Sequence, residues 1–223
     1  MSNAVLSHPM QPKAPAGAGK ALLVSVVLAV WFALVGLLGA RGAFVTAPGA
    51  PPVPLAIGVM APIILFLAAL WISQGFRAFV LSLDPHLMMG IQAWRFAGFG
   101  FLALYANGVL PGLFAWPAGL GDIAIGVTAP WLLVALVRQP NFASSKTFVL
   151  WNVLGMLDLV VAVGTGALGS ALAAGVASEV TTRPMAELPL ILIPAFLVPI
   201  FAMLHVAAVF QARRLARNSA ARG

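Results

Sequence analysis

The sequence predicts an all-α membrane protein with six transmembrane helices, and three observations support this class. Hydrophobic residues make up 62% of the 223 residues, and charged residues only 8%, whereas soluble domains are about 25% charged. Twelve Lys and Arg residues with five Asp and Glu residues are too few to cover a soluble globule of this size. The apolar residues also form long continuous runs, which excludes disordered chains and transmembrane β-barrels, whose strands alternate over about 10 residues.

A helix that crosses about 30 Å of hydrocarbon needs about 20 mostly apolar residues, and six runs have that length. In order, they are Ala21–Ala40, Pro54–Gln74, Leu87–Asn107, Ala118–Val137, Phe148–Leu168 and Leu188–Phe210. They define one transmembrane domain over residues 21–210. The first run exceeds the usual signal-peptide core of about 7–15 residues, so an uncleaved helix is favoured over a cleaved signal.

The two ends of the chain have a different composition from the six runs. Residues 1–20 are rich in Pro, Ala and Gly and show no periodicity, so we expect a flexible cytoplasmic lead. Residues 211–223 are predicted to form a basic cytoplasmic tail. Its arginines are expected to attract anionic lipid headgroups, although a topology signal explains them equally well. These residues are Arg213, Arg214, Arg217 and Arg222.

The basic residues also predict an orientation, because short cytoplasmic loops are enriched in Lys and Arg. With the N-terminus inside, Arg41 and Arg183 fall outside. Nine basic residues fall on the cytoplasmic side, namely Lys13, Lys20, Arg77, Arg138, Lys146, Arg213, Arg214, Arg217 and Arg222. An even number of spans then places both termini in the cytoplasm. The excess of Arg over Lys and the Gly, Ala and Pro content indicate a bacterial inner membrane by composition alone.

Two segments resemble each other and raise the question of an internal repeat. Residues 56–62 (AIGVMAP) match residues 124–130 (AIGVTAP) at six of seven positions. The second, fourth and sixth runs contain interior prolines, and the other three contain none. Three helical hairpins in a parallel threefold repeat would produce this pattern. Chance similarity among abundant small residues is the alternative, and the sequence leaves both open.

Ionisable residues deep in a membrane usually face the helix bundle and find partners, because a central charge costs ~2.5–3.5 kcal/mol on insertion scales. Four are expected at depth: Arg95, Asp122, Asp158 and His205. Asn152 shares one face of the fifth run with Asp158 and several small residues, namely Gly155, Ala162, Gly166 and Gly169. This face favours close helix packing, or else the wall of a small hydrated cavity.

Arg95 and Asp158 have depths that agree within ~5 Å at 1.5 Å rise per residue, so a structural ion pair is favoured. The alternative is that Asp158 lacks this partner and carries a proton. Asp122 is interpreted as a first-turn acid of the fourth helix, after an apolar outer loop that begins near Asn107. His205 is more typical of a hydrogen-bonded packing residue than of a ligand.

No phosphate-binding loop, His-Glu-x-x-His motif or Gly-x-Ser-x-Gly motif occurs, and there is no cysteine. Neither a metal nor a cofactor is predicted, because zinc needs three or four ligands and a bis-histidine haem needs a second buried imidazole. Nucleic acid is not expected as a partner, since the basic residues lie beside apolar runs.

The favoured function is binding or proton-coupled transport of a small solute across the lipid bilayer. The residues expected to carry it are Arg95, Asp158, His205, Asn152 and Asp122. The alternative is a non-catalytic membrane subunit or assembly factor whose glycine faces hold a partner protein or a second copy. An intramembrane enzyme ranks third, because no set of acid, base and nucleophile is visible.

Overall fold

The computed structural model describes residues 18–47, 50–172 and 180–221, and this part of the chain is helical without a strand. Its elements are α1 (Ala18–Ala40), α2 (Val53–Ile72), α3 (Gln74–Val80), α4 (Pro85–Gln92), the 3₁₀ helix η1 (Ala93–Gly98), α5 (Phe99–Ala106), α6 (Gly112–Arg138), η2 (Phe142–Ser144), α7 (Lys146–Leu172), η3 (Arg183–Ala186), the π-helical η4 (Ile193–Leu197) and α8 (Val198–Ala220). Within the described ranges, six helical stretches are long and apolar enough to cross a membrane. The predicted all-α class with six long apolar helices is therefore confirmed.

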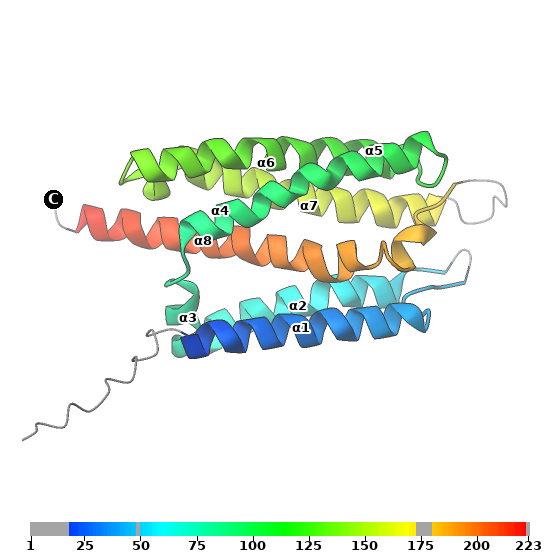
Figure 1. Ribbon diagram of the computed structural model, residues 1–223, viewed down its shortest axis with the longest axis horizontal. Coiled ribbons are helices and arrows are strands. Elements are labelled where there is room, and N and C mark those ends of the chain that lie inside the picture. The colour runs from blue at the N-terminus through cyan, green and yellow to red at the C-terminus, as the bar shows by residue number, and fades with distance from the viewer. Residues whose placement is uncertain (1–17, 48–49, 173–179, 222–223) are drawn as a thin grey trace, which may run out of the picture.

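The long helices run side by side, and α8 occupies the middle of the arrangement (Figure 1). The continuous stretch α4–η1–α5, together with α6 and α7, packs on one side of α8, while α1 and α2 lie on its other side. Helix α1 reaches the rest of the molecule through η4, where Trp31 and Phe32 each meet the edge or face of Phe196. The start of α1 and the end of α8 lie at the same end of the molecule.

Helix α6 begins earlier than predicted, at Gly112 instead of Ala118. Pro111 precedes it in an extended conformation, and Pro117 lies inside the helix. A proline this close to a helix start removes one backbone hydrogen bond but does not prevent the helix from forming. The apolar outer loop expected to begin near Asn107 is therefore shorter than predicted, because residues 112–117 belong to α6. The interpretation of Asp122 as a first-turn acid is wrong, because this residue lies almost three turns inside α6.

The third predicted span contains a local change in helix type that the sequence pattern did not predict. Between α4 and α5 the chain forms the 3₁₀ segment η1, which packs against α6. Glycines allow this approach: a Cβ atom on Gly98 would lie 2.6 Å from Cβ of Asp122, and one on Gly126 would overlap the backbone of Phe96. Because η1 and α6 meet backbone to backbone, the side chain of Arg95 in η1 reaches into the bundle.

Two polar side chains secure the connection from α2 to α4. Arg77 of α3 donates hydrogen bonds to the carbonyls of Leu70 (3.0 Å) and Trp71 (2.9 Å) at the end of α2. Buried Gln211 of α8 donates to the carbonyls of Val80 (3.0 Å) and Leu83 (2.9 Å). Helix α8 thus continues through the segment predicted as a separate tail, as far as Ala220. The predicted lead mostly lies outside the described residues, which begin with α1 at residue 18.

Candidate functional site

Arg95 is the centre of a polar network inside the bundle, and its side chain is fully buried. Its Nε donates to Oδ1 of Asp122 at 2.6 Å, and its Nη2 pairs with Oδ2 of Asp158. Its Nη1 donates to the carbonyl of Gly155 at 3.2 Å and lies 3.1 Å from Nε2 of His205. One guanidinium therefore joins α6, α7 and α8, and the ion pair favoured by the sequence is present.

Glycines on α6 and α7 make the space that this network occupies. A Cβ atom on Gly121 would overlap the carboxylate of Asp158, and one on Gly155 would overlap the imidazole of His205. The small face of α7 predicted from the sequence is thus turned inward. Its opposite face is exposed, as Leu157 and Val160 show.

The hydrogen bonds of His205 define its tautomer. The Nδ2 amide of Asn152 donates to the carbonyl of Phe148 at 2.9 Å, so its Oδ1 remains as an acceptor. Nδ1 of His205 lies 2.9 Å from that Oδ1 and must carry the proton. Nε2 is then free to accept from Arg95, and the imidazole is neutral.

Aromatic rings close the network on two sides. The Trp151 ring meets His205 at a centroid distance of 5.5 Å, and the Trp151 Nε1 donates to Oγ1 of Thr128 at 2.8 Å. The ring of Phe201 lies 5.8 Å from Cζ of Arg95. These contacts keep bulk water away from the inner side of the guanidinium.

The charges of the network do not balance. With both carboxylates ionised and the imidazole neutral, Asp122 and Asp158 contribute two negative charges, and Arg95 contributes one positive charge. An uncompensated charge at this depth is costly. The arrangement is therefore suited to hold one more positive charge, either a proton or a bound cation.

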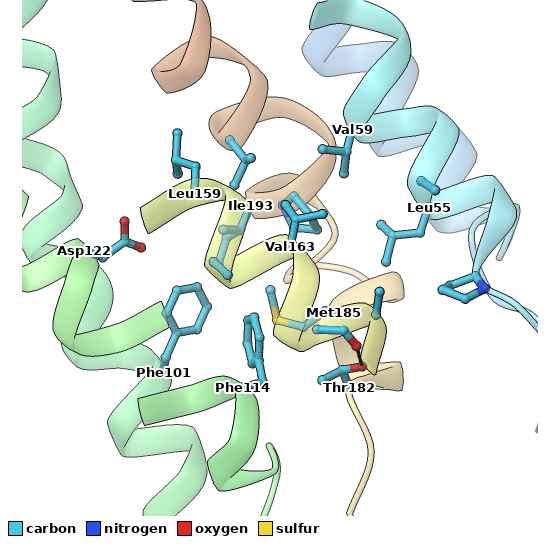
Figure 2. Close-up of a pocket in the computed structure, with 17 residues that line it drawn as sticks. Leu55, Val59, Phe101, Phe114, Asp122, Leu159, Val163, Thr182, Met185 and Ile193 are labelled. Atoms are coloured by element: carbon cyan, nitrogen blue, oxygen red, sulfur yellow. Dashed lines mark hydrogen bonds between the residues drawn. The ribbon is translucent and has the colours of Figure 1, made fainter. Parts of the chain in front are cut away.

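A cavity of about 100 Å³ adjoins the network and ends at Asp122 (Figure 2). Its walls come from α2, α5, α6, α7, η3, η4 and α8. The lining residues are Pro52, Leu55, Ala56, Val59, Phe101, Phe114, Asp122, Leu159, Ala162, Val163, Gly166, Ala167, Thr182, Met185, Ile193, Pro194 and Val198. Among these residues, Asp122 and Thr182 carry the polar side chains, and the hydroxyl of Thr182 already donates to the carbonyl of Gly166 at 2.8 Å.

The cavity lies in one half of the bundle, the half that contains the connections from α1 to α2 and from α5 to α6. The opposite half is filled by a large apolar cluster that includes Met88, Met89, Phe148 and Ala208. Arg95, His205 and Asn152 lie between these two regions. The cavity thus approaches the network from one end of the molecule and meets it at Asp122.

All five residues singled out in the sequence belong to this network. Asp122, Asp158 and His205 lie on α6, α7 and α8, and the extended guanidinium of Arg95 reaches all three. Sequence reasoning missed Gly121 and the cavity walls around Phe101 and Phe114. Repeated small residues in α6 were a signal for close packing, but no local signal marks the cavity. In the described part of the chain, no group of three or more His, Cys, Asp or Glu side chains could hold a metal ion.

Comparison with known proteins gives one family and no functional relative. The family model described as "Domain of unknown function (DUF8737)" matches residues 50–213. This segment includes every residue of the network and all of the cavity. No curated protein and no solved structure matches the chain.

Proposed function

The chain belongs to the DUF8737 family, a domain of unknown function, and we propose that it is a multi-pass membrane protein that moves a small solute by proton-coupled transport. The observation that carries this proposal is the position of Asp122. Its Oδ1 binds Arg95 in the charged network, while its carboxylate borders a largely apolar cavity. A solute in the cavity would thus contact Asp122, the same side chain that takes part in the charged network.

The distribution of charge supports insertion in a membrane with the ends of α1 and α8 in the cytoplasm. The start of α1, the end of α6, the start of α7 and the end of α8 lie at one end of the molecule (Figure 1), and most of the basic residues belong to these helix ends or to α3. In the described residues these are Lys20, Arg77, Arg138, Lys146, Arg213, Arg214 and Arg217. Arg41 and Arg183 are at the other end. Because cytoplasmic ends are the basic ones, the cavity then lies in the outer half, and we place the protein in a bacterial inner membrane.

The coupling in this proposal arises from competition for negative charge. Two carboxylates share one guanidinium, so one additional positive charge stabilises the network. In the empty state, that charge is a proton on Asp122 or Asp158. A solute that changes the charge or hydrogen bonding at Asp122 alters the affinity of the network for this proton, and by linkage the proton alters the affinity for the solute.

His205 and Asn152 support the inner side of the site. The neutral imidazole accepts from Arg95 and is oriented by Asn152. Protonation of Nε2 would remove this acceptor and place two cations against each other. The pair therefore keeps Arg95 directed toward its two carboxylates.

A membrane subunit or assembly factor is the alternative function. In that hypothesis, glycine faces hold helices of a partner. Gly98, Gly119, Gly126 and Gly155 instead meet other parts of the same chain closely, and this supports transport over the alternative.

The test measures proton flux in proteoliposomes that carry an imposed pH gradient and contain a lumenal pH indicator, with a panel of small solutes added outside. With the wild type, we expect the lumenal pH to change at a different rate when a transported solute is present than when it is absent. Asp158→Asn should abolish this effect because it removes one titratable group of the network. Asp84→Asn is the matched control, because it makes the same chemical change at an exposed carboxylate before α4. Absence of solute-dependent flux for every solute, with a stoichiometric partner co-purifying, would instead support the subunit hypothesis.

A further inference from the structure

We infer that the solute is a small alkylammonium cation, with its ammonium group bound to Asp122 and its apolar part in the cavity. This inference rests on the proposed function and specifies the class of substrate. Its first support is the carboxylate itself. Arg95 occupies Oδ1 of Asp122, and among the described residues none donates a hydrogen bond to Oδ2. Asp122 lines the cavity, and this second carboxylate oxygen is left as an acceptor for an N–H donor.

The walls nearest to Asp122 also suit a cation. Phe101 is the ring next to Asp122 in Figure 2, and Phe114 lies beyond it, with the two ring centroids 5.3 Å apart in an edge-to-face arrangement. Met185, with its polarizable sulfur, contributes to the same wall. Aromatic faces attract an ammonium group through their quadrupole, and a carboxylate supplies the counter-charge. This combination recognises an ammonium ion better than it recognises a neutral polar molecule.

The net negative charge of the network argues against an anionic solute. Asp122 and Asp158 outnumber Arg95, which is fully buried and is not among the residues that line the cavity. An anionic solute would meet negative charge in the cavity without a free cationic partner among its lining residues. An ammonium ion instead supplies the positive charge that the network lacks. Its binding therefore displaces the proton, which is the coupling that the proposed function requires.

The dimensions limit the apolar part of the solute. An apolar cavity of about 150 Å³ binds one benzene molecule, whereas this cavity has about 100 Å³. A chain of about four carbons is therefore suitable. Ala56 of α2 and Ala167 of α7 line the cavity and are both exposed. The cavity thus reaches the surface between these two helices, where a lipophilic cation could enter from the bilayer.

The experiment compares three probes of similar shape with purified protein in detergent: butylammonium, 1-butanol and butyrate. Binding is measured by isothermal titration calorimetry at neutral pH. We expect saturable binding of butylammonium at least about tenfold tighter than that of 1-butanol, and no binding of butyrate. Equal affinity for butylammonium and 1-butanol would overturn the inference, because the cavity would then select apolar shape alone.

Three variants locate the binding site. Asp122→Asn should lower the affinity for butylammonium about tenfold or more, while Asp84→Asn should leave it unchanged. If Asp122→Asn does not fold, Ala162→Phe provides the second test, because it places a ring in the cavity and leaves every side chain of the charged network unsubstituted. Unchanged butylammonium affinity in Ala162→Phe would overturn the inference.

The two proposals fail in different ways. Butylammonium binding without any solute-dependent proton flux would contradict proton-coupled transport, while the inference that the protein binds alkylammonium cations would stand. Proton flux coupled to another solute, without butylammonium binding, would contradict the inferred alkylammonium substrate, while the proposal of proton-coupled transport would stand.

Discussion

Arg95 of η1 pairs with Asp158 of α7, although 63 positions separate them in the sequence. The same guanidinium also holds Asp122 of α6 at 2.6 Å. Because the guanidinium is shared, Arg95 should matter more for stability than either carboxylate alone. Removal of Arg95 leaves two negative charges without a partner, whereas removal of one carboxylate leaves a balanced pair.

The first prediction concerns this inequality. Arg95→Ala should reduce the free energy of unfolding by about 3–5 kcal/mol, as expected when a buried charge loses its partner. Asp158→Ala should cost less, because Arg95 and Asp122 remain paired. The double variant Arg95→Ala/Asp158→Ala should lose less free energy of unfolding than the sum of the losses in the two single variants. Unfolding in mixed micelles measures all three, and additive losses would argue against direct pairing.

The second prediction uses two glycines of α7 with different surroundings. A Cβ on Gly155 would overlap the His205 ring, whereas one on Gly164 would have no atom within 4 Å. Gly155→Ala should therefore destabilise the protein by about 1–3 kcal/mol through overpacking. Gly164→Ala should be neutral or stabilising by up to about 1 kcal/mol, because alanine favours the helix. Equal thermal stability of the two variants in detergent would remove the argument for close approach of α7 and α8.

The third prediction concerns the tautomer of His205. Its Nδ1 should carry the proton and its Nε2 should be unprotonated, because Asn152 accepts at one nitrogen and Arg95 donates to the other. Nitrogen-15 chemical shifts of the labelled imidazole distinguish the two ring nitrogens. Asn152→Leu should weaken the preference for this tautomer. A proton on Nε2 in the wild type would be incompatible with the network as described.

The fourth prediction is the topology. A reporter enzyme that is active only in the cytoplasm should be active when fused after Gly223. A reporter active only outside the cytoplasm should be active when fused after Val45, in the connection from α1 to α2. The reason is the concentration of basic residues at the end of the molecule where α8 finishes. Reversed activities of the two fusions would place the cavity in the inner half.

The helices were predictable because their signals are local. Length and apolar composition identify each span without reference to the rest of the chain. The pairing of Arg95 with Asp158 was also predictable, since a charge at depth needs a partner and the two depths agree. The threefold repeat stays a prediction.

The remaining features depend on contacts between distant segments. Asp122 was interpreted as a helix-end residue because Gly112 and Pro117 resemble loop residues, yet both lie in α6. The 3₁₀ segment η1 follows from its close packing on α6, which no periodicity of its own reveals. The cavity requires side chains from α2, α5, α6, α7 and α8 at once. Its existence therefore could not be inferred from any one helix.

The central claim is that two carboxylates sharing Arg95 leave one exchangeable proton in the network. Infrared difference spectroscopy tests it most directly, because a protonated carboxylic acid has a C=O stretching band that a carboxylate lacks. We predict that, at neutral pH, the wild type shows a band that shifts in deuterated water and is absent from both Asp122→Asn and Asp158→Asn. Wild-type protein without this band, and without a bound cation, would contradict the account.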